Sequence, residues 1–531
     1  MTDEQSPKGP EDEATRDDLS GQSRMAWNVA ASWLGHSVFV IAGFFLPRII
    51  DRNLGQLGLG IWDFGWSLVS YLGIAQVGVG SSVNRYVAKR RAEHDTAGLN
   101  RTVSSVMFIQ AIVAVVVLVL TAIGTWMVPL LLDAQLGSYV VDARRVVFLL
   151  GLGVVAQMAF NPFVGVITGC HRWDLHNAIN AGMYAFTAVA MAAVVSFKGG
   201  LGALAAVNLV GTVTAEVIRM VAAYRVCPEL SLRWSSVSRA EARLLLTFGG
   251  KTVVATLAGI LLIQTNSIQI VSVLGASALA LYSRPMSLMR HIQTFVGKFA
   301  FVLTPTASSL HAGGRESALR DLLTESCRVS AYLSIPPLAF LAVMGDPILR
   351  LWMGPSYALG TLVAVLALGH LPGIVHQPVW NILVGMNMHG RIAVASLVAG
   401  VVSVILCAVA LGPLQWGLTG AALALTVPLV LLNFLYTAAY ACRVLRLSYW
   451  RHLVDVWRRP LVCSLPFVLC ILGVRWMFDG RPWVCFLVGT GAGGLVLSAV
   501  YWKWAIPPST KTQAGDALVR TWNRVRGLAA A

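Results

Sequence analysis

Charged residues are scarce in this 531-residue sequence, at 12% of the total. Hydrophobic residues make up 56%, and the mean hydropathy is +0.70. Soluble globular chains normally carry about 25% charged residues. The scarcity of charge therefore excludes an ordinary water-soluble domain and predicts an integral membrane protein.

Catalytic and metal-binding motifs are also missing. The eight cysteines form no Cys-x-x-Cys pair, so neither a disulfide framework nor a metal site is predicted. Gly249-Gly250-Lys251-Thr252 imitates the end of a Walker A loop, but Leu245 stands where that loop needs its first glycine. The sequence contains no nucleophile motif or dinucleotide fingerprint. We expect no enzyme, no cofactor and no metal.

Long apolar stretches are what the sequence does contain. Each is about the 20 residues that a membrane-spanning helix needs, and none alternates as a strand would. They predict an all-α polytopic protein with about fourteen spans, with approximate cores at 27–50, 60–82, 103–132, 146–168, 177–197, 201–223, 246–272, 278–305, 329–349, 358–385, 392–412, 418–441, 460–477 and 483–505.

Lys and Arg gather in alternate loops. The loops after even-numbered stretches are richer in them, so these loops and both termini are predicted to be cytoplasmic. The net charge of +16 then faces an anionic leaflet, with membrane lipids as partners and no nucleic acid.

Short markers recur in the two halves of the chain. Leu54-Gly55 followed by Trp62 is echoed by Leu274-Gly275 followed by Tyr282, and Gly200-Leu201 is echoed by Gly417-Leu418. The order predicts two pseudo-symmetric lobes, a common construction of transporters. The expected organisation is a disordered acidic cytoplasmic tail (1–24), an N-lobe with helices 1–6 (25–225), an amphipathic cytoplasmic linker (226–244), a C-lobe with helices 7–12 (245–445), helices 13–14 (446–505) and a basic cytoplasmic tail (506–531).

The eighth stretch carries a row of basic side chains. Arg284, His291 and Lys298 recur every seven residues, so they share one helical stripe about 21 Å long. Exposing Arg or Lys to lipid at mid-membrane costs about 2.5–3.5 kcal/mol, which favours a water-filled cavity for this stripe. Snorkelling of Arg284 and Lys298 to opposite membrane faces is the alternative.

Other polar side chains in the apolar stretches are weaker candidates for a substrate cavity. Asn28, Ser32 and His36 share a face of the first stretch, with Arg48 near its end, although helix–helix hydrogen bonding explains this face equally well. Trp380 and Asn381 in the tenth stretch suit sugar hydroxyls, whereas Trp380 also suits simple packing. Asn266 in the seventh stretch completes the set.

Several motifs together resemble a known family. They include Leu46-Pro47-Arg48, Gly78-Val79-Gly80-Ser81, Leu303-Thr304-Pro305, Pro347-Ile348-Leu349-Arg350 and Gly385-Met386-Asn387. This ordered set, over residues 25–445, resembles the polysaccharide-transporter branch of the multidrug/oligosaccharidyl-lipid/polysaccharide (MOP) exporter superfamily, which includes the O-antigen flippases.

The resemblance implies a fourteen-helix, two-lobed flippase of the bacterial inner membrane. Its substrate would be an undecaprenyl-diphosphate-linked oligosaccharide, for lipopolysaccharide or exopolysaccharide, with glycosyltransferases and a glycan polymerase as partners. Two positions where family members often carry an acid are Gln76 and Asn266 here, which argues against carboxylate-based ion coupling.

Three alternatives stay open from the residues alone. A cation-coupled multidrug or metabolite exporter would need an intramembrane acid, for which Asp63 and Glu216 are candidates, the latter with Arg219 three residues on. A polytopic glycan polymerase or ligase would need a large outer loop, and the predicted outer loops are short. A transport-inactive scaffold is the third.

Overall fold

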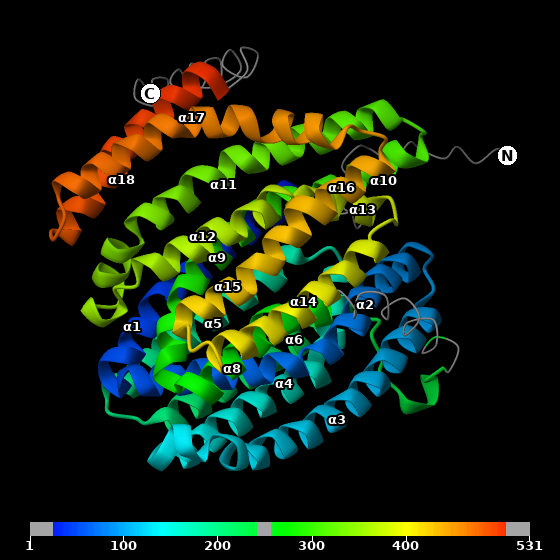
Figure 1. Cartoon of the computed structure of the whole chain (residues 1–531). Coiled ribbons are helices and arrows are strands. Elements are labelled where there is room, and N and C mark those ends of the chain that lie inside the picture. Colours follow the sequence, from blue (N-terminus) through cyan, green and yellow to red (C-terminus); the bar gives the residue numbers. More distant parts are fainter. Residues whose placement is uncertain (1–24, 239–240, 242–255, 506–531) are drawn as a thin grey trace, which may run out of the picture. The chain divides into compact units, whose positions relative to one another are not determined.

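The computed structural model describes residues 25–238, 241 and 256–505, and every regular element in these residues is a helix (Figure 1). The predicted tails at 1–24 and 506–531 lie outside the described residues. Residues 239–240 and 242–244 of the predicted amphipathic linker (226–244) do as well.

The described chain forms two compact units. Unit 1 ends at Ile260 and also includes Gly275–Ser277, and unit 2 comprises Leu261–Leu274 and the residues from Ala278 onward. Unit 1 contains α1 (Met25–Leu72), α2 (Ile74–Ala92), α3 (Thr96–Leu136), η2 (Gly137–Tyr139), α4 (Val140–Gly169), α5 (Trp173–Ser196), α6 (Leu201–Val226) and η3 (Trp234–Ser236).

Unit 2 continues the helical pattern. Its elements are η4 (Leu261–Thr265), α8 (Asn266–Leu274), most of α9 (Ala276–Phe301), α10 (Leu303–Ala312), α11 (Glu316–Trp352), η5 (Pro355–Tyr357), α12 (Gly360–Val375), α13 (Gln377–Gly385), α14 (Gly390–Leu411), α15 (Gly417–Val430), η6 (Leu431–Thr437), α16 (Ala438–Val444), α17 (Tyr449–Met477), α18 (Pro482–Val500) and η7 (Tyr501–Ala505).

Eleven helices in the described residues are long and apolar enough to cross a membrane. The chain is therefore a multi-pass membrane protein. Three of the fourteen predicted stretches are helical without being among the eleven: 27–50 lies in α1, 60–82 lies in α1 and α2, and 278–305 lies in α9 and α10. Arg284, Arg290 and Lys298 reduce the apolar character of α9. Fourteen spans stay a prediction.

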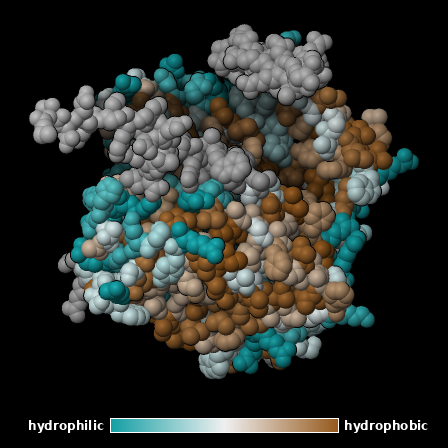
Figure 2. All heavy atoms as spheres, turned by 180° about the vertical axis from the view of Figure 1, so that it is seen from behind, coloured by the Kyte–Doolittle hydropathy of each residue, from teal (hydrophilic) through white to brown (hydrophobic). Residues whose placement is uncertain are grey.

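Apolar side chains cover much of the molecular surface. Figure 2 shows a broad brown area with hydrophilic side chains gathered at its margins. On α3, large side chains such as Val115, Val119 and Leu130 are more than half exposed. Helices satisfy their own backbone hydrogen bonds, so such faces are stable against lipid.

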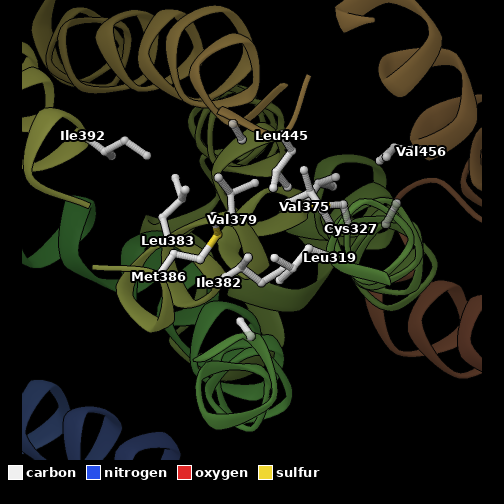
Figure 3. Close-up of a cluster of buried hydrophobic side chains, with 14 of the residues drawn as sticks. Leu319, Cys327, Val375, Val379, Ile382, Leu383, Met386, Ile392, Leu445 and Val456 are labelled. Atoms are coloured by element: carbon white, nitrogen blue, oxygen red, sulfur yellow. The ribbon is translucent and has the colours of Figure 1, made fainter. Parts of the chain in front are cut away.

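Each unit has its own apolar core. In unit 1 the core joins α2, α3, α4 and α6 and includes Val83, Val103, Ile167 and Cys227. In unit 2 it joins α10, α11, α12, α13, α14, α16 and α17, and Figure 3 shows Val379, Ile382 and Leu383 of α13 packed at its centre. The core of unit 2 thus holds α13 in place beside α10.

Residues with left-handed backbone mark the joints between helices. Gly55 (φ 72°) kinks α1, and Gly275 (φ 87°) separates α8 from α9. Glycine suits both joints because it reaches positive φ without a Cβ clash. Four more pairs follow in the next four helix connections, namely His94 with Gly314, Gly137 with Gly354, His171 with Asn387, and Lys198 with Gln415.

The two members of each of these five pairs lie 216 to 220 residues apart. The same joint geometry thus recurs, in the same order, in the first and second set of helices. This recurrence supports, at the level of the backbone, the duplication that the Leu-Gly markers predict from sequence.

Candidate functional site

The basic stripe lies on α9. Arg284 is buried, with 5% of its surface exposed, and the Ser287 hydroxyl donates a hydrogen bond to its backbone carbonyl at 2.8 Å. His291 and Lys298 are half-buried, whereas Arg290, on another face of the same helix, is exposed. The most buried side chain of the stripe is therefore the guanidinium of Arg284.

The predicted polar residues of α13 lie beside the end of α9 and the start of α10. The Thr304 hydroxyl donates to Asn381 Oδ1 at 3.4 Å, and Asn381 Nδ2 donates to the Gln377 carbonyl at 3.3 Å. Gln377 also packs over Gly297, where a Cβ would lie 2.6 Å from its Nε2. Unit 2 therefore brings Asn381 of α13 into one polar region with Gly297 of α9, the residue that precedes Lys298.

Trp380 and Asn266 have packing partners of their own. The Trp380 ring meets the His389 ring edge-on, with centroids 5.6 Å apart. Asn266 is fully buried, and its Nδ2 donates to the Leu262 carbonyl and to Ser403 Oγ, both at 3.0 Å. This amide cross-links α8 and α14, and a role of Asn266 as a substrate ligand stays a prediction.

In unit 1, the predicted residues lie on α1. His36 and Arg48 are half-buried there, and the side chain of Asn28 lies outside the described part of the chain. Neither His36 nor Arg48 lines the cavity found in this unit.

A polar cavity of about 360 Å³ opens between α1, α4, α5 and α6 of unit 1, and the sequence reasoning missed it. Its volume lies within the range of about 300–1,000 Å³ that is typical of small-ligand sites. Its polar wall consists of Gln157 and Asn161 on α4, His176, Asn180, Tyr184 and Thr187 on α5, and Asn208, Thr212, Glu216 and Arg219 on α6.

A chain of hydrogen bonds crosses this cavity wall. Arg219 donates from Nη1 to Glu216 Oε1 and from Nη2 to Asn180 Oδ1. Asn180 Nδ2 in turn contacts His176 Nε2 at 3.1 Å. Since the amide nitrogen is the donor, Nε2 accepts and the ring proton lies on Nδ1.

The charges of this network are buried and balanced. The side chain of Glu216 is 3% exposed and that of Arg219 is 12% exposed. Three buried atoms of the network have no hydrogen-bond partner among the described residues: Glu216 Oε2, Arg219 Nε and His176 Nδ1. Unpartnered buried polar groups carry an energetic cost, and ligand-binding sites are one place where they persist.

A signal for this cavity was present in the sequence. Polar residues recur four positions apart on three helices, as Gln157 and Asn161, as His176, Asn180 and Tyr184, and as Asn208, Thr212 and Glu216. That spacing places each set on one face of its helix. Among the residues of this cavity, only Glu216 and its neighbour Arg219 were named as candidates from the sequence, as the intramembrane acid of an exporter and its partner.

A family model described as "Polysaccharide biosynthesis protein" matches residues 63–360. The chain belongs to this family. The match includes α4, α5, α6 and α9, and therefore the cavity of unit 1, apart from its α1 residues, and the basic stripe of unit 2. The polysaccharide family that the sequence motifs indicate is thereby confirmed.

Relatives of this polysaccharide biosynthesis protein extend the comparison. It is 21% identical over 421 residues to the uncharacterized membrane protein EpsK of Bacillus subtilis, covering 78% of this chain and 83% of EpsK. The fold is similar to that of the lipid II flippase MurJ in an inward closed conformation, with a TM-score of 0.65 and 12% identity over 91% of this chain and 100% of MurJ.

Transporters of the MOP superfamily share the fold. An inward-facing multidrug resistance transporter of the MATE family gives a TM-score of 0.61 at 14% identity, covering 76% of this chain and 94% of its own. A MOP superfamily transporter from Pyrococcus furiosus gives 0.58 at 13% identity, covering 82% and 98%. This polysaccharide biosynthesis protein therefore has a transporter fold.

Proposed function

We propose that this protein is a flippase that moves a lipid-linked oligosaccharide, with an undecaprenyl-diphosphate carrier, across the bacterial inner membrane by alternating access. The observation that carries the proposal is Arg284, a guanidinium buried on helix α9 and continued along its stripe by His291 and Lys298. Arg binds phosphate oxygens through forked hydrogen bonds, so a diphosphate headgroup suits this stripe. Membership in the family and the MurJ-like fold support the same function.

The alternative of a cation-coupled exporter is less favoured by unit 1. Glu216 is a carboxylate buried among membrane-spanning helices, and Arg219 already neutralises it. A transported cation would have to displace that guanidinium. The basic residues of α9 would also repel a cationic substrate.

Orientation gives the first testable expectation of the proposal. Both termini are cytoplasmic, so a reporter fused after Lys198, between α5 and α6, should lie outside, and one fused after Arg233, beyond α6, should lie inside. The excess of Lys and Arg in alternate loops is the reason. Paired phosphatase and fluorescent-protein fusions measure this. The same compartment for both sites would contradict the topology.

A leaflet assay tests the function itself. In spheroplasts that lack this protein, the lipid-linked oligosaccharide should accumulate and stay inaccessible to an added impermeant glycosidase, because the headgroup remains in the inner leaflet. Supplying the protein should make the oligosaccharide accessible, while glycosyltransferases and a polymerase act before and after this step. Equal access with and without the protein would refute the flippase proposal.

A further inference from the structure

We infer that the cavity of unit 1 binds an uncharged, hydroxyl-rich sugar ring of the transported glycan. The inference rests on the proposed function and adds a place where the sugar itself is recognised. The proposed diphosphate site lies on α9 of unit 2, and the cavity belongs to different helices.

The chemistry of the cavity wall matches sugar hydroxyls. Four side-chain amides, of Gln157, Asn161, Asn180 and Asn208, line it. An amide offers donors and an acceptor on one group, and a sugar hydroxyl needs both at once. The hydroxyls of Tyr184, Thr187 and Thr212 have the same double character.

An aromatic surface borders these polar groups. The rings of Phe39 on α1 and Tyr184 on α5 lie with centroids 4.1 Å apart and planes inclined by 32°, and both residues line the cavity. A sugar ring presents apolar C–H groups on its faces and hydroxyls on its rim. An aromatic wall next to amides offers a partner to each.

The balance of charge selects against ionic ligands. Glu216 and Arg219 cancel each other, and Asn180 uses its carbonyl oxygen on Arg219. An anion would have to compete with Glu216 and a cation with Arg219. A neutral ligand leaves the ion pair intact and forms its hydrogen bonds with the amides and hydroxyls that line the cavity.

Close packing fixes the shape of the site. A Cβ at Gly211 would overlap Thr187 Oγ1, so α5 and α6 approach each other at the cavity. The Thr212 hydroxyl donates to the Asn208 carbonyl at 2.9 Å, which holds its side chain against α6. The amides of Gln157, Asn161 and Asn208 therefore project from a rigid frame of helices.

Site-specific photo-crosslinking tests the inference for any sugar, because the probe captures whatever molecule lies beside it. A photoreactive benzoylphenylalanine replaces Asn208 in the full-length protein, in the membranes of cells that make the glycan. The matched control carries it at Val210 on the same helix, which is 65% exposed. Mass spectrometry should find a hexose-bearing adduct at position 208 and a sugar-free lipid adduct at position 210. A sugar-free adduct, or none, at position 208 would overturn the inference.

Substitutions give a second, independent measure. Asn161→Leu and Asn208→Leu should each weaken the binding of the extracted lipid-linked oligosaccharide to the purified protein by about tenfold, because each removes hydrogen bonds of one amide. Their binding of undecaprenyl diphosphate without sugar should be unchanged, as should both affinities of Val210→Leu. Equal loss for both probes, or no loss, would refute the sugar site.

These outcomes separate the inference from the proposed function. A hexose-bearing adduct that carries no polyprenyl chain would keep the sugar site and refute the flippase. Leaflet transfer that proceeds normally while position 208 captures no sugar would keep the flippase and refute the site.

Discussion

Replacing Arg284 with alanine is expected to abolish export of the glycan while leaving the protein inserted in the membrane. Arg284 is the most buried member of the α9 stripe, and a forked pair of charge-assisted hydrogen bonds to a phosphate is lost with it. Charge-assisted bonds contribute about 1.5–3 kcal/mol each, so transfer should fall about 100-fold or more. Glycan accessibility in the leaflet assay measures the loss.

Two further variants control for general damage to α9. Arg284→Lys keeps the charge but loses the fork, so it should restore transfer only in part. Arg290→Ala changes an exposed cation on the same helix and should transfer normally. Normal export by Arg284→Ala, with protein levels matched, would contradict the assignment of the diphosphate to this stripe.

Replacing Arg219 with methionine is expected to lower the free energy of unfolding by about 3–5 kcal/mol. The change leaves Glu216 buried without its partner and removes the donor to Asn180. Removal of one member of a buried ion pair is costly because the remaining charge is still out of water. Unfolding in mixed micelles with increasing denaturing detergent gives the measurement.

The double substitution distinguishes a charge effect from loss of volume. Glu216→Gln combined with Arg219→Met removes both charges and should recover at least half of the stability lost. Arg225→Met, an exposed change near the end of the same helix, should leave stability unchanged. If the double variant were as unstable as Arg219→Met alone, the buried ion pair would not be the cause.

Composition and hydropathy predicted the helical class because lipid leaves a chain few ways to satisfy its backbone. The same signal left breaks at 51–59 and 273–277, where Gly55 kinks α1 and Gly275 separates α8 from α9. It could not show that a left-handed backbone at these glycines changes the helix direction, because hydropathy carries no information on φ. The recurring Leu-Gly markers lie at both joints.

The candidate site was predictable only in part. The stripe of α9 follows from spacing within one helix, whereas the cavity of unit 1 requires four helices, α1, α4, α5 and α6, to meet. Asn180 and Arg219 are 39 residues apart in the sequence and exchange a hydrogen bond only because α5 packs on α6. Asn266 is the opposite case, because its polar side chain in an apolar stretch suggested a cavity residue. That side chain donates a hydrogen bond to Ser403 and so links α8 to α14.

The five matched joints have a practical consequence. Gly137 and Gly354 are glycines in both joints of their pair, whereas His94 adopts the left-handed backbone that Gly314 adopts in the paired joint. A residue with a Cβ pays more for that conformation than glycine does. Each joint can therefore be altered alone and compared with its paired joint in the same polypeptide, under identical lipid, expression and assay conditions.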